Sequence, residues 1–202
     1  MSGVGGKYIP NANDGQDMDH DVYVVQIVAD GPDGFPADHV AEIGICGVSL
    51  SRMDADSVYG EVVALDPREL GKRRLDYLEE RAGITAGELY AGTPEEKVIG
   101  EVKSLLQGGT VAAYDIKNVF YYHLLNGAWD LTGTVSFMPA ISARLDRGFR
   151  PAVRGDENIC IRKAYEAMCP GDPMGVGGGS RALDCAQMSA AVMMELRRAG
   201  RY

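Results

Sequence analysis

The sequence has no excess of positive charge and no long hydrophobic run. Its 20 Lys and Arg residues are outnumbered by 29 Asp and Glu residues, which gives a formal net charge of -9. Proteins that follow the phosphates of a nucleic acid usually present a basic surface, so this balance disfavours strong non-specific nucleic-acid binding. No apolar run reaches the roughly 18 residues of a membrane span, and the N-terminal residues lack the apolar core of a signal peptide. We therefore expect a cytoplasmic protein with no membrane partner.

Cysteine is also scarce and scattered. None of the four Cys residues forms a CxxC pair, and no histidine cluster lies near them in the sequence. Neither a zinc site nor a disulfide framework is therefore indicated. The chain of 202 residues, 46% of them hydrophobic, is long enough to bury a stable core without such supports. We expect a flexible acidic leader at residues 1–21 and one domain at residues 22–202.

Strand signals come first in that domain and helix signals follow. A β-branched run after the leader ends at a turn rich in Gly, Pro and Asp, which is typical of a strand. Thr93 and Glu96 form a capping-box pattern at the start of a helix, and Asp115 is suited to cap another. This order predicts a mixed α/β fold. The predicted strands span residues 22–29, 40–50, 57–65 and 110–114, and the main predicted helices span 68–82, 94–107, 116–125, 159–168 and 180–198.

Four short motifs occur along the chain in a fixed order. They lie at residues 24–48, which include the letters A-E-I-G at 41–44, and at residues 83–89, 111–120 and 180–186. In order and spacing they resemble the motifs of the DnaQ-like (DEDDh-type) 3′–5′ exonuclease family. The resemblance covers residues 22–198 and implies a ribonuclease H-like mixed sheet flanked by helices.

The resemblance also implies a particular chemistry. In this family two divalent cations, magnesium or manganese, are held by Asp and Glu carboxylates and act on the phosphate at the 3′ end of single-stranded DNA or RNA. Such hard cations need several anionic oxygens. A histidine near the terminal helix commonly acts as the general base. The residues at the corresponding positions of this chain therefore decide whether it can hold the two cations.

These positions hold few suitable side chains. Asp30 retains the first carboxylate and is the one expected metal ligand, whereas Pro32 replaces the glutamate two residues later. Val119 stands at the position of the second motif's aspartate. In the terminal motif, Ser180 replaces the histidine and Cys185 replaces the aspartate. A thiol is a soft ligand that suits magnesium poorly, so we expect a catalytically degenerate site.

Nearby carboxylates leave a second interpretation open. Asp33, Asp115 and Asp184 each lie within four residues of a replaced ligand. With Asp30 they would form a shifted cluster that supports magnesium- or manganese-dependent exonuclease activity. The competing interpretation is structural, since Asp suits turns and helix N-caps. Asp184 is also rotated by about 100° from Cys185 around its helix.

Three tyrosines suggest a surface for nucleic-acid bases. Tyr114, Tyr121 and Tyr122 lie at the end of the 110–114 strand and just after it, and aromatic rings stack on bases in many single-strand-binding proteins. A locally basic stretch follows at residues 144–163. The competing interpretation is that the rings are buried and that the arginines form a solvated face.

Three functional hypotheses remain. The leading one is an exonuclease-like domain, catalytically degenerate, that binds a single-stranded DNA or RNA end or a protein partner. The second is the working metal-dependent exonuclease with shifted carboxylates. The third is a structural or oligomerising regulatory module, which draws on the acidic charge and on Met188, Met193 and Met194 in the terminal helix. Methionines in such a helix fit either a core or an interaction face.

Overall fold

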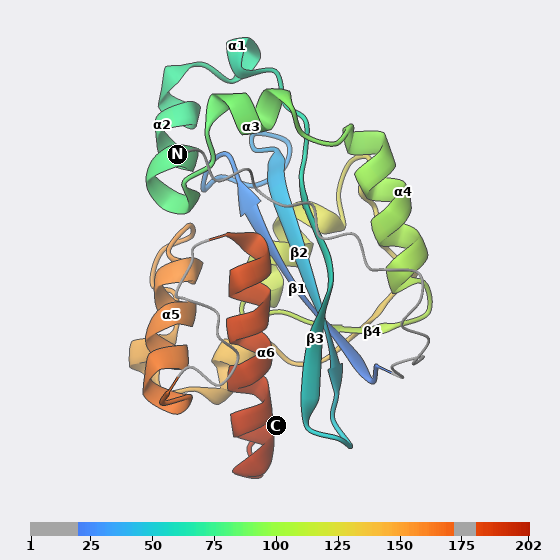
Figure 1. Cartoon of the computed structure of the whole chain (residues 1–202), viewed down its shortest axis with the longest axis vertical. Helices are drawn as coiled ribbons and strands as arrows, with labels where there is room; N and C mark the ends of the chain where they lie inside the picture. The colour runs from blue at the N-terminus through green and yellow to red at the C-terminus, as the bar shows by residue number, and fades with distance from the viewer. Residues whose placement is uncertain (1–19, 172–180) are drawn as a thin grey trace.

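A mixed β-sheet forms the centre of the protein (Figure 1). The computed structural model describes residues 20–171 and 181–202, so residues 1–19 of the predicted leader and Ser180 lie outside the described ranges. Within these ranges five strands lie in the order β3-β2-β1-β4-β5. The β1–β2 and β2–β3 pairs are antiparallel, and the β1–β4 and β4–β5 pairs are parallel. The strands are β1 (Val22–Ala29), β2 (Val40–Ser49), β3 (Asp54–Val62), β4 (Thr110–Ala112) and β5 (Ser136–Phe137).

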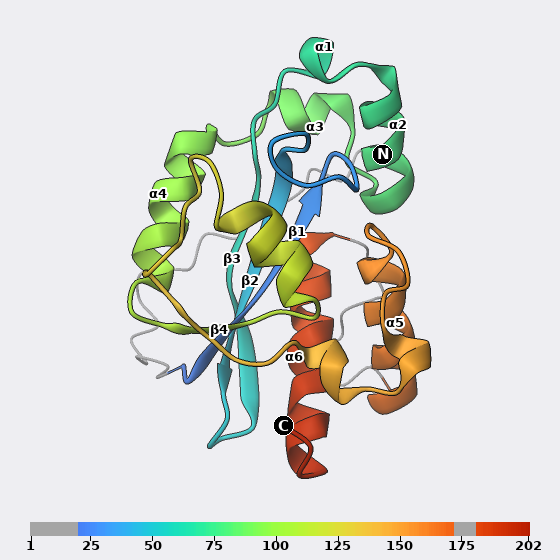
Figure 2. The ribbon, with the colours of Figure 1, turned by 180° about the vertical axis from the view of Figure 1, so that it is seen from behind.

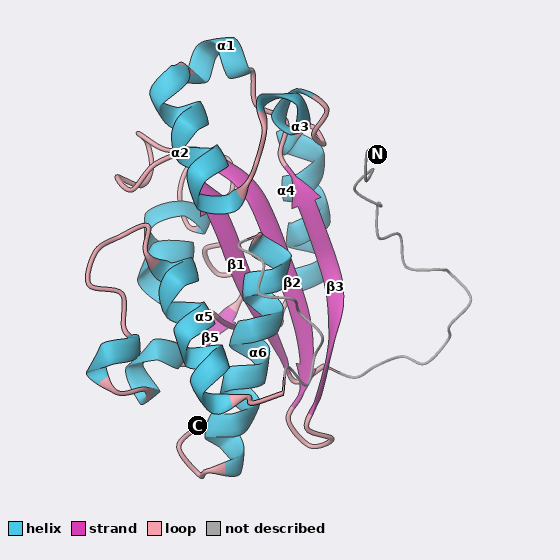
Figure 3. Ribbon diagram, turned by 60° about the vertical axis from the view of Figure 1, so that its left-hand side comes forward, coloured by secondary structure: helices cyan, strands magenta, loops and turns pink. Residues whose placement is uncertain are grey.

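Helices cover both faces of this sheet. The helices α5 and α6 pack on one face (Figure 1), and α4 and the π-helix η1 pack on the other (Figure 2). Figure 3 shows the sheet between these layers. Among the described residues, no helix is both long and apolar enough to cross a bilayer. The helices are α1 (Pro67–Leu70), α2 (Lys72–Ala82), α3 (Ala86–Tyr90), α4 (Glu95–Leu106), η1 (Lys117–Leu124), the 3-10 turns η2 (Ile141–Arg144) and η3 (Arg147–Phe149), α5 (Glu157–Met168) and α6 (Ala182–Arg198).

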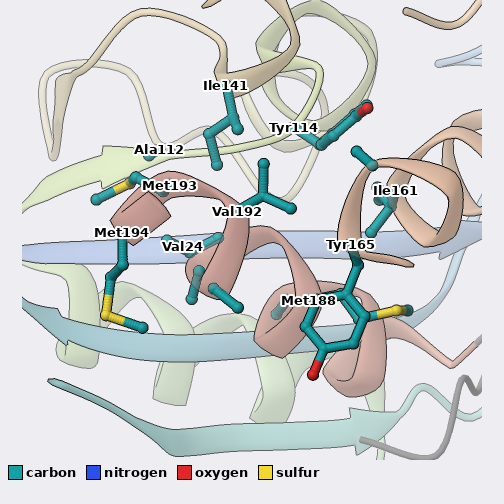
Figure 4. Packing of buried hydrophobic residues seen from close by; sticks show 14 of the residues in the cluster. Val24, Ala112, Tyr114, Ile141, Ile161, Tyr165, Met188, Val192, Met193 and Met194 are labelled. Atoms are coloured by element: carbon teal, nitrogen blue, oxygen red, sulfur yellow. The ribbon is translucent and has the colours of Figure 1, made fainter. Parts of the chain in front are cut away.

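The alternation of side chains along β1 builds two cores. Val24 packs with α5 and α6, whereas its neighbour Val25 packs with α4 and η1, because successive side chains of a strand point to opposite faces. Met188 and Met193 are fully buried in the same core as Val24 (Figure 4). Of the two alternatives that the sequence left open for these methionines, the structure therefore shows core packing.

The A-E-I-G segment of β2 positions the terminal helix. Glu42 is buried, and its carboxylate accepts hydrogen bonds from the Arg181 side chain and the Ala182 backbone N–H, both at 2.9 Å. Burial nevertheless raises the pKa of Glu42 above its ordinary value. A side chain at Gly44 would overlap the backbone at Leu183, so the glycine lets α6 lie directly on β2. These contacts between β2 and the start of α6 fix the position of the first turn of α6 beside β1.

Several local predictions differ from the structure. The helix predicted at residues 68–82 is divided at Gly71 into α1 and α2. The helix α4 begins at Glu95 and has Pro94 at its N-cap position, without a side-chain cap. The hydroxyl of Thr93 instead donates to Glu61 at 2.8 Å, so the predicted capping box with Glu96 is absent. A capping box does occur one helix earlier, at the start of α3. The strand predicted at residues 57–65 also starts three residues earlier, at the beginning of β3.

Candidate functional site

A cavity of about 50 Å³ lies where β1 meets α2, α5, α6 and η1. We call it the β1 cavity. Gln26 and Val28 share the face of β1 that looks toward α6, since alternate residues of a strand point the same way. The side-chain N–H of Gln26 donates to the Ser189 hydroxyl of α6 at 3.1 Å, which confirms this orientation. The residues that line the cavity include Gln26, Val28, Tyr77, Arg81, Asn118, Glu157, Asn158, Ile161 and Cys185.

The lining of the β1 cavity does not fit a pair of divalent cations. It offers amides, apolar groups, the Cys185 thiol, the Tyr77 hydroxyl and the Arg81 guanidinium, together with one carboxylate. Burial raises the pKa of Cys185 to about 12, so the thiol stays protonated at neutral pH. Magnesium and manganese need several anionic oxygens. Throughout residues 20–171 and 181–202, no group of three or more His, Cys, Asp or Glu side chains is arranged to hold a metal ion.

Glu157 supplies the one carboxylate of the β1 cavity. It is the first residue of α5, and only 9% of its surface is exposed. One carboxylate oxygen, Oε2, accepts a hydrogen bond from the Gly155 backbone N–H at 2.9 Å, whereas Oε1 is buried and has no hydrogen-bond partner. Burial raises the pKa of Glu157 to about 7. No sequence motif marks this residue, because a Glu at the start of a helix is common.

Asp30 lies in a different place from the β1 cavity. It follows β1, and its fully buried carboxylate accepts hydrogen bonds from the His39 backbone N–H at 2.7 Å and from the Arg74 guanidinium at 2.6 Å. The same guanidinium contacts Asp38 at 3.0 Å. Asp30, Pro32, Asp38 and Arg74 line a separate hollow of about 180 Å³, which we call the Asp30 hollow.

The positions that match the family's motifs do not all line one hollow. Cys185 lines the β1 cavity, whereas Asp30 and Pro32 line the Asp30 hollow. Val119 is 1% exposed and packs in the core between the sheet and α4. An apolar side chain in that core offers no ligand to a cation. Ser180 lies outside the described residues.

The four carboxylates of the alternative site are not gathered either. Asp115 caps η1, because its Oδ1 accepts hydrogen bonds from the backbone N–H groups of Lys117 at 2.9 Å and Asn118 at 3.4 Å. Asp33 is on the exposed turn after β1. Asp184 is part-buried on α6, and burial raises its pKa. Asp30 is bound to Arg74, as described above. The structural interpretation of these residues matches their surroundings, and no shared metal position joins them.

The three tyrosines separate into one buried ring and two exposed rings. Tyr114 is fully buried, and its hydroxyl donates to the carbonyls of Phe149 and Cys160, so the prediction that it stacks on bases is wrong. Tyr121 is 58% exposed and Tyr122 is 37% exposed. A ring at the end of a strand can face either the core or solvent, and sequence position alone did not distinguish these outcomes.

The exposed tyrosines belong to a larger aromatic surface. Tyr121 stacks on Phe137 with ring centroids 6.2 Å apart, and the guanidinium of Arg154 lies 4.1 Å from the centre of the Tyr122 ring. Phe35 is 51% exposed, and its backbone N–H donates to the Tyr122 carbonyl at 2.8 Å. We call Phe35, Tyr121, Tyr122, Phe137 and Arg154 the aromatic surface.

The aromatic surface and the β1 cavity share two segments of the chain. Asn118 of η1 lines the cavity, and Tyr121 and Tyr122 follow on the same helix. Arg154 belongs to the surface, and Glu157, three residues later, belongs to the cavity. The helix η1 and the segment before α5 therefore contribute residues to both features.

Comparison with solved structures identifies the fold. A full-length 3′-exonuclease has a TM-score of 0.59 at 13% sequence identity, over 90% of this chain and 83% of its own. The nuclease domain of 3′hExo, a DEDDh family member bound to rAMP, has a TM-score of 0.58 at 13% identity, over 92% of this chain and 96% of its own. Exonuclease I of E. coli in complex with a dT13 oligonucleotide has a TM-score of 0.56 at 14% identity, over 87% of this chain and 40% of its own. No protein-family model and no curated protein matches the sequence.

Proposed function

We propose that this chain, whose fold is that of the DEDDh 3′-exonucleases, binds single-stranded nucleic acid without cleaving it. The lining of the β1 cavity carries the proposal. Gln26 and Val28 alternate on β1 beside Cys185, and we infer that they, rather than Asp30 and Pro32, occupy the positions of the family's first two carboxylates. An amide, an alkyl group and a protonated thiol cannot supply the anionic oxygens of a two-metal centre.

The aromatic surface supports the binding role. One structure of this fold is described by its 3′-end-specific recognition of a histone mRNA stem-loop, and another was solved with an oligonucleotide. Stacking of a base on an exposed ring contributes about 1–3 kcal/mol per base and tolerates any sequence. Tyr121 and Tyr122 offer such rings, and Arg154 adds a cation beside them. Because the net charge is -9, stacking rather than phosphate attraction supplies most of the affinity.

Fluorescence anisotropy with a labelled oligouridine tests this binding role. We expect Tyr121→Ala and Tyr122→Ala each to weaken binding by about tenfold, which corresponds to about 1.4 kcal/mol. The matched control is Tyr90→Ala, because Tyr90 is 76% exposed but belongs to α3, which contributes no residue to the aromatic surface. Equal losses in all three variants, or no binding by the wild-type protein, would contradict the proposal.

A nuclease assay tests the non-catalytic part separately. We expect no shortening of single-stranded DNA or RNA by the wild-type protein with magnesium or manganese, because the β1 cavity offers one carboxylate where a two-metal centre needs several anionic oxygens. Robust hydrolysis that disappears in a folded Asp30→Asn variant would instead support the metal-dependent exonuclease with shifted carboxylates.

A further inference from the structure

The strand β3 lies at the edge of the sheet. No strand of residues 20–171 or 181–202 lies beyond it in the sheet order (Figure 3). Its last carbonyl, that of Val62, accepts a hydrogen bond from the Thr93 backbone N–H at 2.8 Å. Along the rest of β3 the outer edge offers backbone N–H and C=O groups to which an extended segment can add as a further strand.

One face of β3 is turned toward α6 and carries small side chains. Ala55 packs against the core that contains α6, and the Ser57 hydroxyl accepts a hydrogen bond from the side chain of Gln187 at 2.6 Å. A Cβ at Gly60 would lie 3.1 Å from the side chain of Leu183, so this glycine is also on the α6 face. The α6 face of β3 therefore carries no charge.

The other face of β3 is acidic. The strand holds Asp54, Asp56 and Glu61 but no Lys or Arg. These residues alternate with those of the α6 face, and successive side chains of a strand point to opposite faces, so all three carboxylates lie away from α6. The His20 ring contacts Asp56 at 2.6 Å, whereas Asp54 is exposed. A cation beside this face would be attracted to it.

A groove of about 380 Å³ lies between the first half of β3, the end of α5 and the second half of α6. We call it the β3 groove. Buried apolar residues of α5 and α6, Cys169 and Met194 among them, line it. Its charged residues on α6, Glu195 and Arg198, form an ion pair with each other. A cavity of about 150 Å³ holds a benzene ring, so the β3 groove can hold an apolar side chain.

We propose that the outer edge of β3 binds an extended segment of a partner protein in which Lys or Arg alternates with apolar residues. The backbone of this segment pairs with β3, and its apolar side chains enter the β3 groove. Its cations then lie on the opposite face, beside Asp54 and Asp56, where opposite charges on neighbouring strands attract. The β3 groove shares no residue with the aromatic surface, so this binding goes beyond the proposed function.

The charges of β3 argue against a second copy of the chain as the occupant. Two copies joined by antiparallel pairing of their β3 strands would bring the carboxylates of both strands onto one face of a continuous sheet. Neither strand carries a Lys or Arg that would separate them. Like charges that face each other across paired strands are destabilising. A basic segment is therefore the complementary partner.

Fluorescence anisotropy with three labelled heptapeptides tests the proposal. The first peptide, KVKLKVK, alternates Lys with apolar residues. The second, KKVLVKK, has the same composition without the alternation, and the third, EVELEVE, reverses the charge. We expect the first peptide to bind at least about tenfold more tightly than either of the others, because it alone matches both faces of β3.

The Asp54→Lys variant assigns the binding to β3. Because the substitution replaces an attraction by a repulsion at an exposed position, we expect the affinity for KVKLKVK to fall by about tenfold. The matched control is Glu79→Lys, which makes the same change in net charge on α2. Glu79 is exposed, and α2 does not line the β3 groove, so the control should bind the peptide as the wild-type protein does.

Four outcomes would overturn the proposal. The first two are equal binding of the three peptides, or no binding of KVKLKVK, and these comparisons need no variant. The third is an equal loss in Asp54→Lys and Glu79→Lys, which would show that the peptide responds to net charge alone. The fourth is a dimer of the wild-type protein in sedimentation experiments that KVKLKVK dissociates, since a second copy would then be the occupant. None of these results bears on the binding of oligouridine to the aromatic surface.

Discussion

The Asp30 hollow and the β1 cavity lie side by side and share Gly31 and Tyr77 in their linings. They differ in whether the oxygens of their buried carboxylates have hydrogen-bond or ion-pair partners. In the Asp30 hollow, the fully buried side chains of Asp30 and Asp38 both contact the Arg74 guanidinium. In the β1 cavity, the single carboxylate leaves one oxygen without a partner. Each oxygen of the two buried carboxylates in the Asp30 hollow therefore has a partner, whereas one oxygen of Glu157 has none.

The difference bears on which of these carboxylates can bind a ligand. A carboxylate whose oxygens are occupied by an arginine and by backbone N–H groups stabilises a loop and has little capacity left for a ligand. Asp38 illustrates this, because one of its oxygens also accepts a hydrogen bond from the Gly34 backbone N–H at 2.6 Å. Glu157 keeps a free acceptor in a cavity, which is the property that binding requires.

The largest effect is expected when the pairing in the Asp30 hollow is broken. Arg74→Ala leaves the two buried carboxylates without their shared cation, which should lower the free energy of unfolding by about 3 kcal/mol or more. Urea denaturation measures the loss as a shift in midpoint at constant slope.

The control for this variant is its neighbour on α2. Arg73 is exposed and makes no hydrogen bond or ion pair with residues 20–171 or 181–202. Arg73→Ala should therefore change the free energy of unfolding by less than about 0.5 kcal/mol. Similar losses for both variants would mean that the Arg74 contacts are screened by solvent and that the two hollows do not differ as argued.

The next effect is a pH dependence that belongs to the β1 cavity. The pKa of Glu157 is raised from 4.5 to about 7 in the folded protein. Between these values the folded state keeps a proton that the unfolded state has lost, so the contribution of Glu157 to stability falls as pH rises and is fully lost above about pH 7. The loss is on the order of 3 kcal/mol.

Glu157→Gln should remove this dependence. We expect the variant to gain stability relative to the wild-type protein as pH rises from about 5 to about 8, as measured by chemical denaturation at each pH. Glu166→Gln should follow the wild-type curve, because Glu166 is exposed. Parallel curves for wild type and Glu157→Gln would show that the carboxylate of Glu157 is solvated in the folded state.

Much of the fold could be predicted from the sequence because its signals are local. The predicted strand at residues 22–29 has the bounds of β1, since a β-branched run followed by a Gly-Pro turn is determined by its own residues. The order of the motifs likewise indicated the mixed sheet flanked by helices. Asp115 was correctly expected as a helix cap, because the cap acts on the next few backbone N–H groups.

The candidate site was harder to predict because it depends on tertiary contacts. Matching the first motif to the one available aspartate placed it at Asp30, past the end of β1, whereas the strand residues beside Cys185 are Gln26 and Val28. Glu157 is separated from these strand residues by most of the chain, and only packing shows that its oxygen has no partner. No local pattern contains that information.

The smallest expected effect tests which residues correspond to the family's metal ligands. The combined variant Gln26→Asp, Val28→Glu, Asn118→Asp and Cys185→Asp places four new carboxylates around the β1 cavity. Because these positions line one cavity, the variant should bind manganese at least about tenfold more tightly than the wild-type protein, a gain of about 1.4 kcal/mol. Isothermal titration calorimetry on protein shown to be folded by circular dichroism measures this.

The decisive comparison is with carboxylates at the positions first suggested by the motifs. Pro32→Glu, Val119→Asp and Cys185→Asp, with Asp30 retained, should bind manganese no better than the wild-type protein. The reason is geometric: Pro32 lines the Asp30 hollow, Val119 is in the core beside α4, and only Cys185 lines the β1 cavity. A higher manganese affinity for this variant than for the variant of the β1 cavity would show that Asp30, despite its contacts with Arg74, corresponds to the family's metal position. The assignment of Gln26 and Val28 to the first family motif would then be wrong.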